Sequence, residues 1–481
     1  MPSTRDEHDP PGLSSNPEHG RAAHPTPGVS GPWSLDKLAA VAGESEARLR
    51  DYADAGLLHR QSDGEFEADS LHRVRLIQFA RSRGISDEHL ATAIASQGDL
   101  LRIFDELVPV SDATVNIADA ARELGVDDAM ITELAEILRW DDVAAGTESD
   151  VATLQVLVKA LALGMPRDAL MQMVHVFAEA TDRLADAIVR TFHNYVHERF
   201  RAQGLTGPEL LAASEGAGKP LLDLIEPTIV YFHRRAYQRA NREDLLRHLA
   251  EPTTPTSTTP GEEQATVLFV DLASFTPLTA MMGDHAAAEV LGRFGATVRS
   301  SAAQHRGRVL KQIGDEFMLL FAQPADAIAF GLAMDRFVDA EPLFPALHIG
   351  AHCGTVLYRE GDYVGGTVNL AARVASAGSA GQFLITEDMR NAAGDHSEMY
   401  FIALPPRRLK GIPDPVCLVE VRQRISSRSN RAMDPVCGML LHPDDVAAET
   451  SWAGHEFRFC SNTCKQAFEA EPGRFASTDG K

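Results

Sequence analysis

Apolar side chains recur at helical spacing through the first half of the chain. One such stripe consists of Leu154, Leu157, Val158 and Leu161, at positions i, i+3, i+4 and i+7. Such a stripe is typical of the buried face of a helix. Residues 101–250 contain no run of alternating apolar and polar positions, the pattern of a half-buried strand. We therefore expect an all-α region over residues 101–250.

A shorter helical segment precedes this region, over residues 31–100. Ser34 is a favourable N-cap, and the helix that follows it ends at the next glycine. A second helix is expected over about residues 45–54, so that a helix, a turn and a helix follow one another. Together with the run RLRDYADAGLL, from Arg48 to Leu58, this arrangement resembles the helix-turn-helix head of MerR-type regulators.

The pattern changes after residues 251–262, which are rich in proline and threonine and are expected to form an extended linker. Residues 265–270 are a short β-branched run typical of a strand. A further pair of strands is expected to form a hairpin around Gly314 and Asp315, and longer helical segments lie between the strands. This mixture predicts an α+β domain over residues 263–424.

The chain ends in a small cysteine-bearing module, expected over residues 433–477 after a second linker at residues 425–432. Five cysteines in 481 residues argue against a disulfide framework, and three of them fall in this module, which points to metal chemistry there. The other two, Cys353 and Cys417, lie on expected strands, where we expect them to be core residues.

Composition and charge narrow the classes of protein that this chain can be. A hydrophobic content of 44% is ordinary for a globular protein. The formal net charge of −23 predicts a surface that repels nucleic acid and anionic membranes. No apolar stretch approaches the ~20 residues of a membrane-spanning helix, and residues 1–30, an expected disordered tail, lack the apolar core of a signal peptide. We therefore expect a reduced, cytoplasmic protein without a membrane partner.

Three segments of the expected α+β domain carry candidate chemistry. Asp271 ends an apolar strand and is followed by a turn of small residues before a helix, and Asp315 lies in the run KQIGDEF. Two aspartates at the ends of neighbouring strands form an oxygen site suited to Mg²⁺ or Mn²⁺. The turn offers backbone N–H groups to phosphate, and Asn369 and Arg373 point from one face at the start of a further helix.

Each of these motifs alone also has a purely structural explanation. Asp315 could belong to an ordinary turn, Asn369 could start a helix, and Arg373 could be a solvated charge. All three motifs together, in this order and spacing, favour a metal–triphosphate site.

Residues 265–421 resemble the class III nucleotidyl cyclases. The family motif F-x-D-I-x-G-F-T is matched by FVDLASFT, Phe269 to Thr276, in which Ser274 replaces the glycine and stiffens the turn without removing a ligand. The resemblance implies a ferredoxin-like α+β catalytic domain within a multidomain protein. It also implies that Ser274, Phe275 and Thr276 bind the substrate's phosphates.

The resemblance implies a role for each of the other polar residues. Asp271 and Asp315 would bind two Mg²⁺ or Mn²⁺ ions in each active site. Asn369 would position the ribose, and Arg373 would stabilise the charge that develops at the α-phosphate. Lys410, in LKGIPDP, would contact the triphosphate.

Adenylate cyclases of this family recognise the purine with a lysine and an aspartate, and those positions fall on Lys311 and Asp362. Guanylate cyclases typically carry a glutamate and a small residue or cysteine there. The family builds its sites in a head-to-tail homodimer, with metal ligands from one subunit and the purine readers and Asn/Arg pair from the other. The resemblance therefore implies a homodimeric adenylate cyclase that converts ATP into cyclic AMP and pyrophosphate.

The C-terminal module, with MDPVCGM, FRFCSNTCKQAF and PGRF, closely resembles a YHS domain, which is often attached to metal-handling proteins. Cys437, Cys460 and Cys464 suit a soft-metal site for Zn²⁺ or Cu⁺. A fourth ligand is missing or comes from elsewhere, and His455 is a candidate. Three cysteines packed in a small core are the alternative.

The N-terminal region suggests a regulatory role. Residues 31–100 hold eight Lys/Arg against twelve Asp/Glu, so the MerR-like head offers few cations to DNA phosphates, and DNA is an unexpected partner. The helical region resembles the N-terminal regulatory regions of acid-responsive actinobacterial cyclases. His193 and His197 share a helix face there and would bind metal or sense pH, unless they are ordinary surface histidines.

Two alternatives to an adenylate cyclase stay open. A guanylate or relaxed-specificity cyclase is disfavoured by Lys311 and Asp362. A DNA-binding regulator that carries a cyclase-derived nucleotide sensor is disfavoured by the negative head and by the intact aspartate pair.

Overall fold

The structure is a computed structural model that describes most of residues 32–476. The residues outside the description are 1–31, 63, 68, 100, 102–114, 141–145, 251–258, 342, 395–398, 424–430 and 477–481. The expected N-terminal tail lies outside the described residues, as does most of each expected linker. The chain forms two compact units, residues 1–251 and 252–481.

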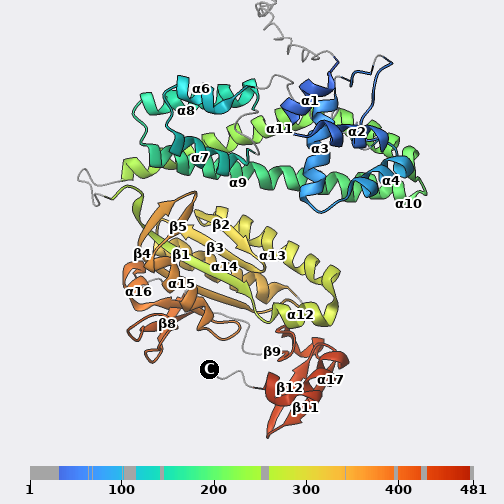
Figure 1. Cartoon of the computed structure of the whole chain (residues 1–481). Coiled ribbons are helices and arrows are strands. Elements are labelled where there is room, and N and C mark those ends of the chain that lie inside the picture. The colour runs from blue at the N-terminus through green and yellow to red at the C-terminus, as the bar shows by residue number, and fades with distance from the viewer. Residues whose placement is uncertain are drawn as a thin grey trace, which may run out of the picture. The chain divides into compact units, whose positions relative to one another are not determined.

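Four helices begin the first unit (Figure 1): α1 (Leu35–Ala42), α2 (Glu46–Asp54), α3 (Ser70–Ser82) and α4 (Asp87–Gln97). Gly43 ends α1 at φ 65°, in the left-handed region that glycine adopts readily. Ser45 caps α2 by accepting a hydrogen bond from the Arg48 N–H at 3.3 Å. The apolar faces of these helices meet in a core that contains Leu38 and Leu49. The predicted helix, turn and helix are confirmed.

The other helices described in this unit are α6 (Ile117–Glu123), α7 (Asp128–Leu138), α8 (Glu148–Ala162), α9 (Arg167–Phe192), α10 (Glu198–Ala202) and α11 (Gly207–Ala250). A π-helical turn, His193–His197, joins α9 to α10. Leu154 and Leu157 are buried in a core shared by α6, α7, α8 and α9, which confirms the predicted stripe. None of the helices in the described residues combines the length and apolar character needed to cross a bilayer.

An eight-stranded sheet organises the second unit (Figure 1). Its strands are β1 (Glu262–Leu272), β2 (Gly307–Ile313), β3 (Glu316–Phe321), β4 (Leu347–Arg359), β5 (Asp362–Val364), β6 (Phe383–Thr386), β7 (Met399–Ala403) and β8 (Leu418–Gln423). They lie in the order β2-β3-β1-β4-β6-β8-β7, with β5 paired to β4. β1 starts at the last residue of the expected linker, because its pairing with β4 extends that far.

The first half of this sheet has ferredoxin-like topology. Helix α13 (Asp284–Gln304) connects β1 to β2, and α14 (Pro324–Ala340) connects β3 to β4. β1, β2, β3 and β4 with these two helices follow the β-α-β-β-α-β order of that fold. The predicted α+β domain is therefore confirmed.

Different helices cover the two faces of β1. Leu268 lies in the core with α13 and α14, whereas Val267 packs with α15 (Gly366–Ser376). Gly350 lets α15 approach β4 closely, because a Cβ at this position would come within 2.0 Å of the Ala375 nitrogen. This close approach fixes the helix that carries the predicted Asn/Arg pair.

The cysteine-bearing module consists of β9 (Ala432–Met433), β10 (Leu440–Leu441), β11 (Ala448–Trp452), β12 (His455–Phe459), α17 (Asn462–Ala470) and α18 (Pro472–Phe475). β9 pairs with β10 and β11 pairs with β12, both antiparallel. Phe468 of α17 packs against Phe457 and Phe459, with ring centroids 4.6 and 5.3 Å away. These contacts join the helix to the β11–β12 hairpin.

Candidate active site and cysteine cluster

Two predicted metal ligands meet where β1 ends. The antiparallel register of β1 and β3 places Asp271 beside the start of β3, where Asp315 and Glu316 lie. The Asp271 Oδ1 lies 3.0 Å from the His348 Nδ1 on β4. The structure therefore brings both aspartates to one edge of the sheet.

Burial and mutual repulsion act on these carboxylates. Burial raises the pKa of Asp315, and the charge of Asp271 raises it further. Burial also raises the pKa of Glu316, with contributions from both aspartates. A cation relieves repulsion of this kind, and carboxylate oxygens are ligands for hard cations. The residues present therefore fit the predicted Mg²⁺ or Mn²⁺.

The turn between β1 and α12 (Phe275–Met282) holds a non-glycine residue in an unfavourable conformation. Ser274 has φ 58° and ψ 32°, in the left-handed region that costs a residue with a Cβ about 1–2 kcal/mol. Its side chain makes no capping hydrogen bond, so it does not occupy the first N–H groups of the helix. This geometry explains the glycine that the family motif usually has here.

Lys311 on β2 and Asp362 at the start of β5 form an ion pair. Each side chain is 38% exposed, so both groups are accessible to a ligand. The Asp362 Oδ1 accepts a hydrogen bond from the Tyr363 N–H at 2.8 Å, while the Oδ2 contacts the lysine. The structure thus brings the two predicted purine-reading residues together in one subunit.

The remaining predicted residues of this site occupy exposed positions. Asn369 and Arg373 lie one turn apart on α15, and Lys410 lies on a turn between β7 and β8. Within the described part of the chain, no hydrogen bond or ion pair joins any of them to Asp271 or Asp315. A single chain therefore assembles the carboxylates without joining them to the Asn/Arg pair.

Sequence reasoning missed two residues of this site. Glu316 directly follows Asp315 in the run GDEF, and that adjacency was a usable signal. His348 pairs in register with Asp271 across β1 and β4, and no local motif marks it. Its role depends on a strand pairing that sequence reasoning did not establish.

Three cysteines and an aspartate meet in the C-terminal module. The Cys460 Sγ lies 3.6 Å from both the Cys437 Sγ and the Cys464 Sγ. The ligand atoms of these cysteines and of Asp434 all lie within 4.8 Å of one another, the one such group found among the described residues. His455, the candidate for a fourth ligand, is exposed at the start of β12 and lies outside this group, whose fourth member is Asp434.

Asp434 orders the cluster through backbone hydrogen bonds. Its buried carboxylate accepts from the Val436 and Cys437 N–H groups at 2.9 and 3.4 Å, and from the Cys460 N–H at 2.8 Å. Burial raises the pKa of this carboxyl group. The aspartate is part of the motif MDPVCGM, but the motif alone does not show that its carboxylate joins the Cys437 and Cys460 segments.

The other two cysteines were expected to be core residues. Cys353 is partly buried on β4, whereas Cys417 is exposed. The expectation is wrong for Cys417, because β8 begins only at Leu418 and the preceding loop lies at the surface.

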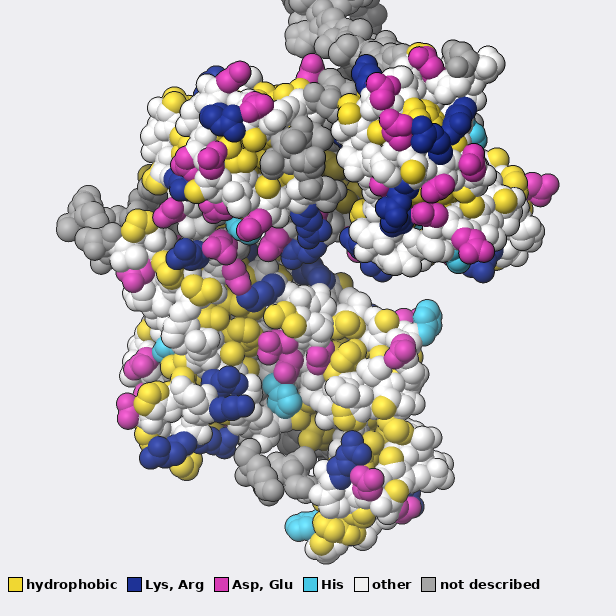
Figure 2. All heavy atoms as spheres, viewed as in Figure 1, with side chains coloured by type: hydrophobic (Ala, Val, Ile, Leu, Met, Phe, Trp, Pro, Cys, Tyr) yellow, Lys and Arg dark blue, Asp and Glu magenta, His cyan; other side chains and the backbone are white. Residues whose placement is uncertain are grey.

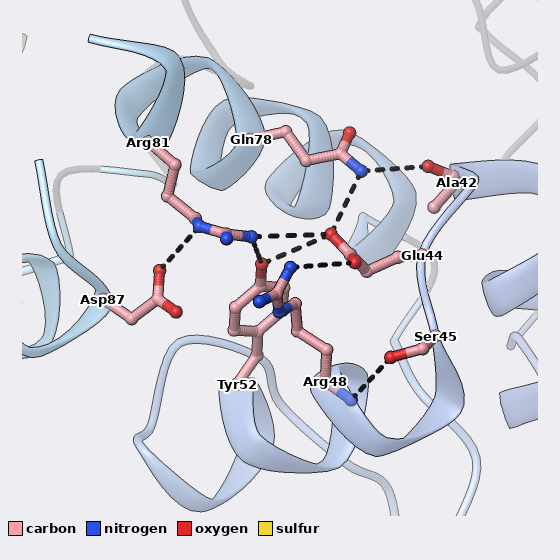
Figure 3. Close-up of polar contacts among 8 residues, drawn as sticks. All are labelled: Ala42, Glu44, Ser45, Arg48, Tyr52, Gln78, Arg81 and Asp87. Atoms are coloured by element: carbon pink, nitrogen blue, oxygen red, sulfur yellow. Dashed lines mark hydrogen bonds and ion pairs between the residues drawn. The ribbon is translucent and has the colours of Figure 1, made fainter. Parts of the chain in front are cut away.

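Cations of the MerR-like head are held in ion pairs (Figure 3). Arg81 of α3 lies 3.8 Å from Glu44 and 3.5 Å from Asp87, and it donates to the Tyr52 hydroxyl at 2.9 Å. Arg48 of α2 pairs with the same Glu44 at 3.6 Å. Positive and negative side chains are interspersed over the visible face of this unit (Figure 2). These pairs occupy cations that DNA phosphates would require.

His193 and His197 lie on one face of the π-helical turn, as predicted. Their rings stack with centroids 4.9 Å apart. The His197 Nδ1 lies 3.0 Å from the Ser214 Oγ of α11, and the His193 Nε2 lies 3.5 Å from a Glu198 carboxylate oxygen. The pair therefore sits where the turn contacts the last helix of the unit.

Comparison with known proteins identifies both parts of the second unit. Residues 258–414 match the adenylate and guanylate cyclase catalytic domain, and residues 432–479 match the YHS domain. A pH-sensitive adenylate cyclase from Mycobacterium tuberculosis is 26% identical over 370 residues, which cover 73% of this chain and 88% of that protein. An adenylate cyclase from Streptomyces coelicolor is 27% identical over 274 residues, which cover 53% of this chain and 66% of that protein. A solved structure, the adenylyl cyclase CyaB from P. aeruginosa, is 23% identical, with a TM-score of 0.31 and coverage of 34% of this chain and 96% of that chain.

The chain is therefore an enzyme of the cyclase class, with an adenylate and guanylate cyclase catalytic domain. In sequence it is similar to actinobacterial adenylate cyclases, and its C-terminal part matches the YHS domain. The family resemblance and the multidomain fold predicted from the motifs are confirmed.

We expect Asp315→Asn to abolish cyclase activity and to stabilise the fold at neutral pH. Activity should fall at least about 100-fold, because the candidate metal site would lose one of its two predicted carboxylate ligands. The raised pKa of Asp315 means that the folded state binds its proton more readily than the unfolded state, so the ionised carboxylate destabilises the fold. This destabilisation is present at neutral pH and is lost as the pH falls through the raised pKa toward the ordinary value of 3.8.

Thermal unfolding in the absence of divalent metal measures this effect. The melting temperature of Asp315→Asn should exceed that of the wild type at neutral pH, and the difference should shrink in acid. Glu289→Gln, which removes an exposed charge on α13, is the control and should change neither property. Near-normal turnover by Asp315→Asn would show that this residue is not a metal ligand.

Proposed function

We propose that the protein is an adenylate cyclase that converts ATP into 3′,5′-cyclic AMP and pyrophosphate at the interface of a homodimer. The observation that carries this proposal is the pairing of Lys311 with Asp362. Adenine presents an acceptor at N1 and a donor at its exocyclic amine, which match a lysine and an aspartate side by side. Guanine presents the reversed pattern and would leave both groups unpaired.

The residues around this pair suit cyclisation of ATP. Asp271 and Asp315 would hold the metal ions, which when bound lower the pKa of the ribose 3′-OH and neutralise the triphosphate. The first N–H groups of α12 bind phosphate oxygens, and Lys410 adds a positive charge. Asn369 positions the ribose for in-line attack of its 3′-oxygen on the α-phosphorus, with pyrophosphate as the leaving group. Arg373 stabilises the charge that develops on the α-phosphate.

A homodimer accounts for the separation of these groups in one chain. In a head-to-tail dimer the carboxylates of one subunit face the purine readers and the Asn/Arg pair of the other. Apolar side chains near the reader pair support such an interface: Ile313 on β2 is 63% exposed, and Tyr358 and Val364 on β4 and β5 are also exposed. Exposed apolar residues grouped in this way are typical of protein interfaces.

We also propose that the helical N-terminal region regulates the enzyme through His193 and His197. The alignment with the pH-sensitive relative covers 73% of this chain, more than residues 252–481 can supply, so the similarity extends into the helical region. Protonation of two stacked imidazoles places like charges together and disfavours the packing that holds them. Glu198, which contacts His193, and Ser214, which contacts His197, would then change their interactions with the two rings.

Mixing two inactive variants tests the shared site. Asp271→Ala and Arg373→Ala should each be inactive, and their mixture should recover activity because the mixed dimer contains one intact site. Random mixing makes half of the dimers mixed, so recovery of about a quarter of wild-type activity is expected. The measurement is cyclic AMP production from Mn²⁺-ATP after subunit exchange.

The matched control is a mixture of Asp271→Ala with Asp315→Ala. Both lesions then affect the same half of the site, so no mixed dimer contains an intact one. Recovery in this control, or no recovery in the first mixture with mixed dimers demonstrated, would exclude the head-to-tail arrangement.

Substrate choice tests the reader pair, because the matched catalytic domain includes guanylate as well as adenylate cyclases. Lys311→Glu combined with Asp362→Cys should lower the ratio of kcat/KM for ATP over GTP. Each lost matched hydrogen bond contributes about 1–3 kcal/mol when buried, which predicts a fall of at least about 10-fold. Arg359→Gln, next to Asp362 in the β4–β5 register, makes the same net charge change of −1 and serves as the control. An unchanged ratio would remove these two residues from substrate recognition.

The histidine pair is tested in the full-length protein. Histidine ordinarily changes charge between about pH 5 and 8, and the activity of the wild type should change across this range. His193→Gln with His197→Gln should remove part of that change, whereas His175→Gln, an exposed histidine on α9, should not. Superimposable pH profiles of wild type and double variant would mean that the pair is structural.

A further inference from the structure

The cysteine cluster of the YHS domain takes no part in the reaction proposed above, yet its hairpin packs against the turn that contains Ser274. We propose that Asp434, Cys437, Cys460 and Cys464 bind one thiophilic d¹⁰ ion, Zn²⁺ or Cu⁺, and that this ion activates the cyclase by fixing the turn. The effect on activity rests on the proposed function, whereas metal binding is measured independently of it.

The geometry of the thiols fits a single ion. The two Sγ–Sγ distances to Cys460 are 3.6 Å. Sulfur ligands of one tetrahedral Zn²⁺, each at about 2.3 Å, lie roughly 3.8 Å apart. The three cysteines are free thiols from three segments: the loop after β9, the end of β12 and the first turn of α17. Asp434 already holds the Cys437 and Cys460 segments together, so the ligands are arranged before an ion binds.

Backbone hydrogen bonds join the β9–β10 hairpin to the cyclase domain. The Ala346 N–H donates to the Gly438 carbonyl at 3.0 Å, and the Leu440 N–H donates to the Phe344 carbonyl at 3.1 Å. Cys437 lies in the same continuous apolar core as Phe344. The segment that carries the first cysteine is therefore packed into the cyclase domain.

The same contacts lead to the catalytic carboxylates. The Ala273 N–H donates to the Ala346 carbonyl at 2.7 Å, and Ala273 lies between Asp271 and Ser274 in the sequence. Two residues beyond Ala346, His348 contacts Asp271. The backbone of Ala346 is thus hydrogen-bonded to the YHS hairpin through its N–H group and to the turn at Ala273 and Ser274 through its carbonyl group.

Gly438 lies directly against this turn. A Cβ at position 438 would come within 2.6 Å of the Ala273 carbonyl oxygen and 3.0 Å of the Ser274 Cβ. The left-handed conformation of Ser274 persists only while its surroundings hold it. An ion that ties Cys437 to the other two cysteines holds Gly438 in contact with the turn that contains Ser274. Loss of the ion allows both Gly438 and this turn to move.

The first test uses the full-length protein, stripped of thiophilic metal under reducing conditions. Zn²⁺ and Cu⁺ are added in separate arms, bound metal is counted by elemental analysis after gel filtration, and cyclic AMP production is measured with Mg²⁺-ATP. We expect one ion per chain in at least one arm and a rise in activity of about 5-fold or more. Cys464→Ser should lose the ion and the rise, whereas Cys417→Ser, which alters an exposed cysteine outside the cluster, should keep both.

Each of the other outcomes contradicts a different part of the proposal. If neither ion is retained, the metal site is wrong. If an ion is retained and activity does not change, the control of the cyclase is wrong. If no cyclic AMP forms in either state, the proposed function fails, and coupling is then measured as a change in Mg²⁺-ATP affinity by calorimetry, where equal affinities exclude it.

A matched pair of glycine variants separates metal binding from the effect of the metal on cyclase activity. Gly438 and Gly454 both have left-handed backbones, at φ 72° and 84°, but a Cβ at Gly454 would meet no atom within 4 Å. Gly438→Ala should still retain the ion while losing its effect on activity. Gly454→Ala should resemble the wild type in both measurements. Identical behaviour of the two variants would show that the contact between Gly438 and the turn at Ser274 does not carry the effect of the metal to the active site.

Discussion

The register between β1 and β3 is the constraint on which the catalytic site depends. It places Asp271 beside Asp315 and Glu316, and burial together with repulsion raises the pKa of the latter two. The apolar cores on both faces of the sheet hold this register against the repulsion. Folding therefore leaves carboxylates whose repulsion a divalent cation would relieve, and perturbed groups of this kind are typical of functional sites.

The features that could be predicted from the sequence have local signals. Ser34 marks the start of a helix and Gly43 its end, because capping involves residues within one turn. The hairpin around Gly314 follows from a turn residue between two apolar runs. Asn369 and Arg373 share a helix face because they are four residues apart. In each case the deciding residues are close in the chain.

The features that could not be predicted depend on contacts between distant segments. His348 reaches Asp271 across 77 positions because β4 pairs with β1. Asp434 meets Cys460 across 26 positions, so the cysteine motifs left the fourth ligand open, with His455 as one candidate. Ser274 was expected in the phosphate turn, but its left-handed backbone follows from the way β1 turns into α12. Such contacts can be inferred only after the fold is known.

The two candidate metal sites differ in ligand chemistry, and this difference would allow one chain to respond to two kinds of ion. Carboxylate oxygens at Asp271 and Asp315 suit hard cations, whereas three thiolates select soft or borderline ones. In the proposed coupling, a change in the bound thiophilic ion would therefore act on the cyclase without competing for the metal that binds with the substrate. If the proposed coupling runs through the backbone of Ala346, thermodynamic linkage makes it reciprocal: a nucleotide that orders the turn at Ser274 would change the metal affinity of the cysteine cluster by the same factor. The YHS domain would then report on the catalytic site as well as control it.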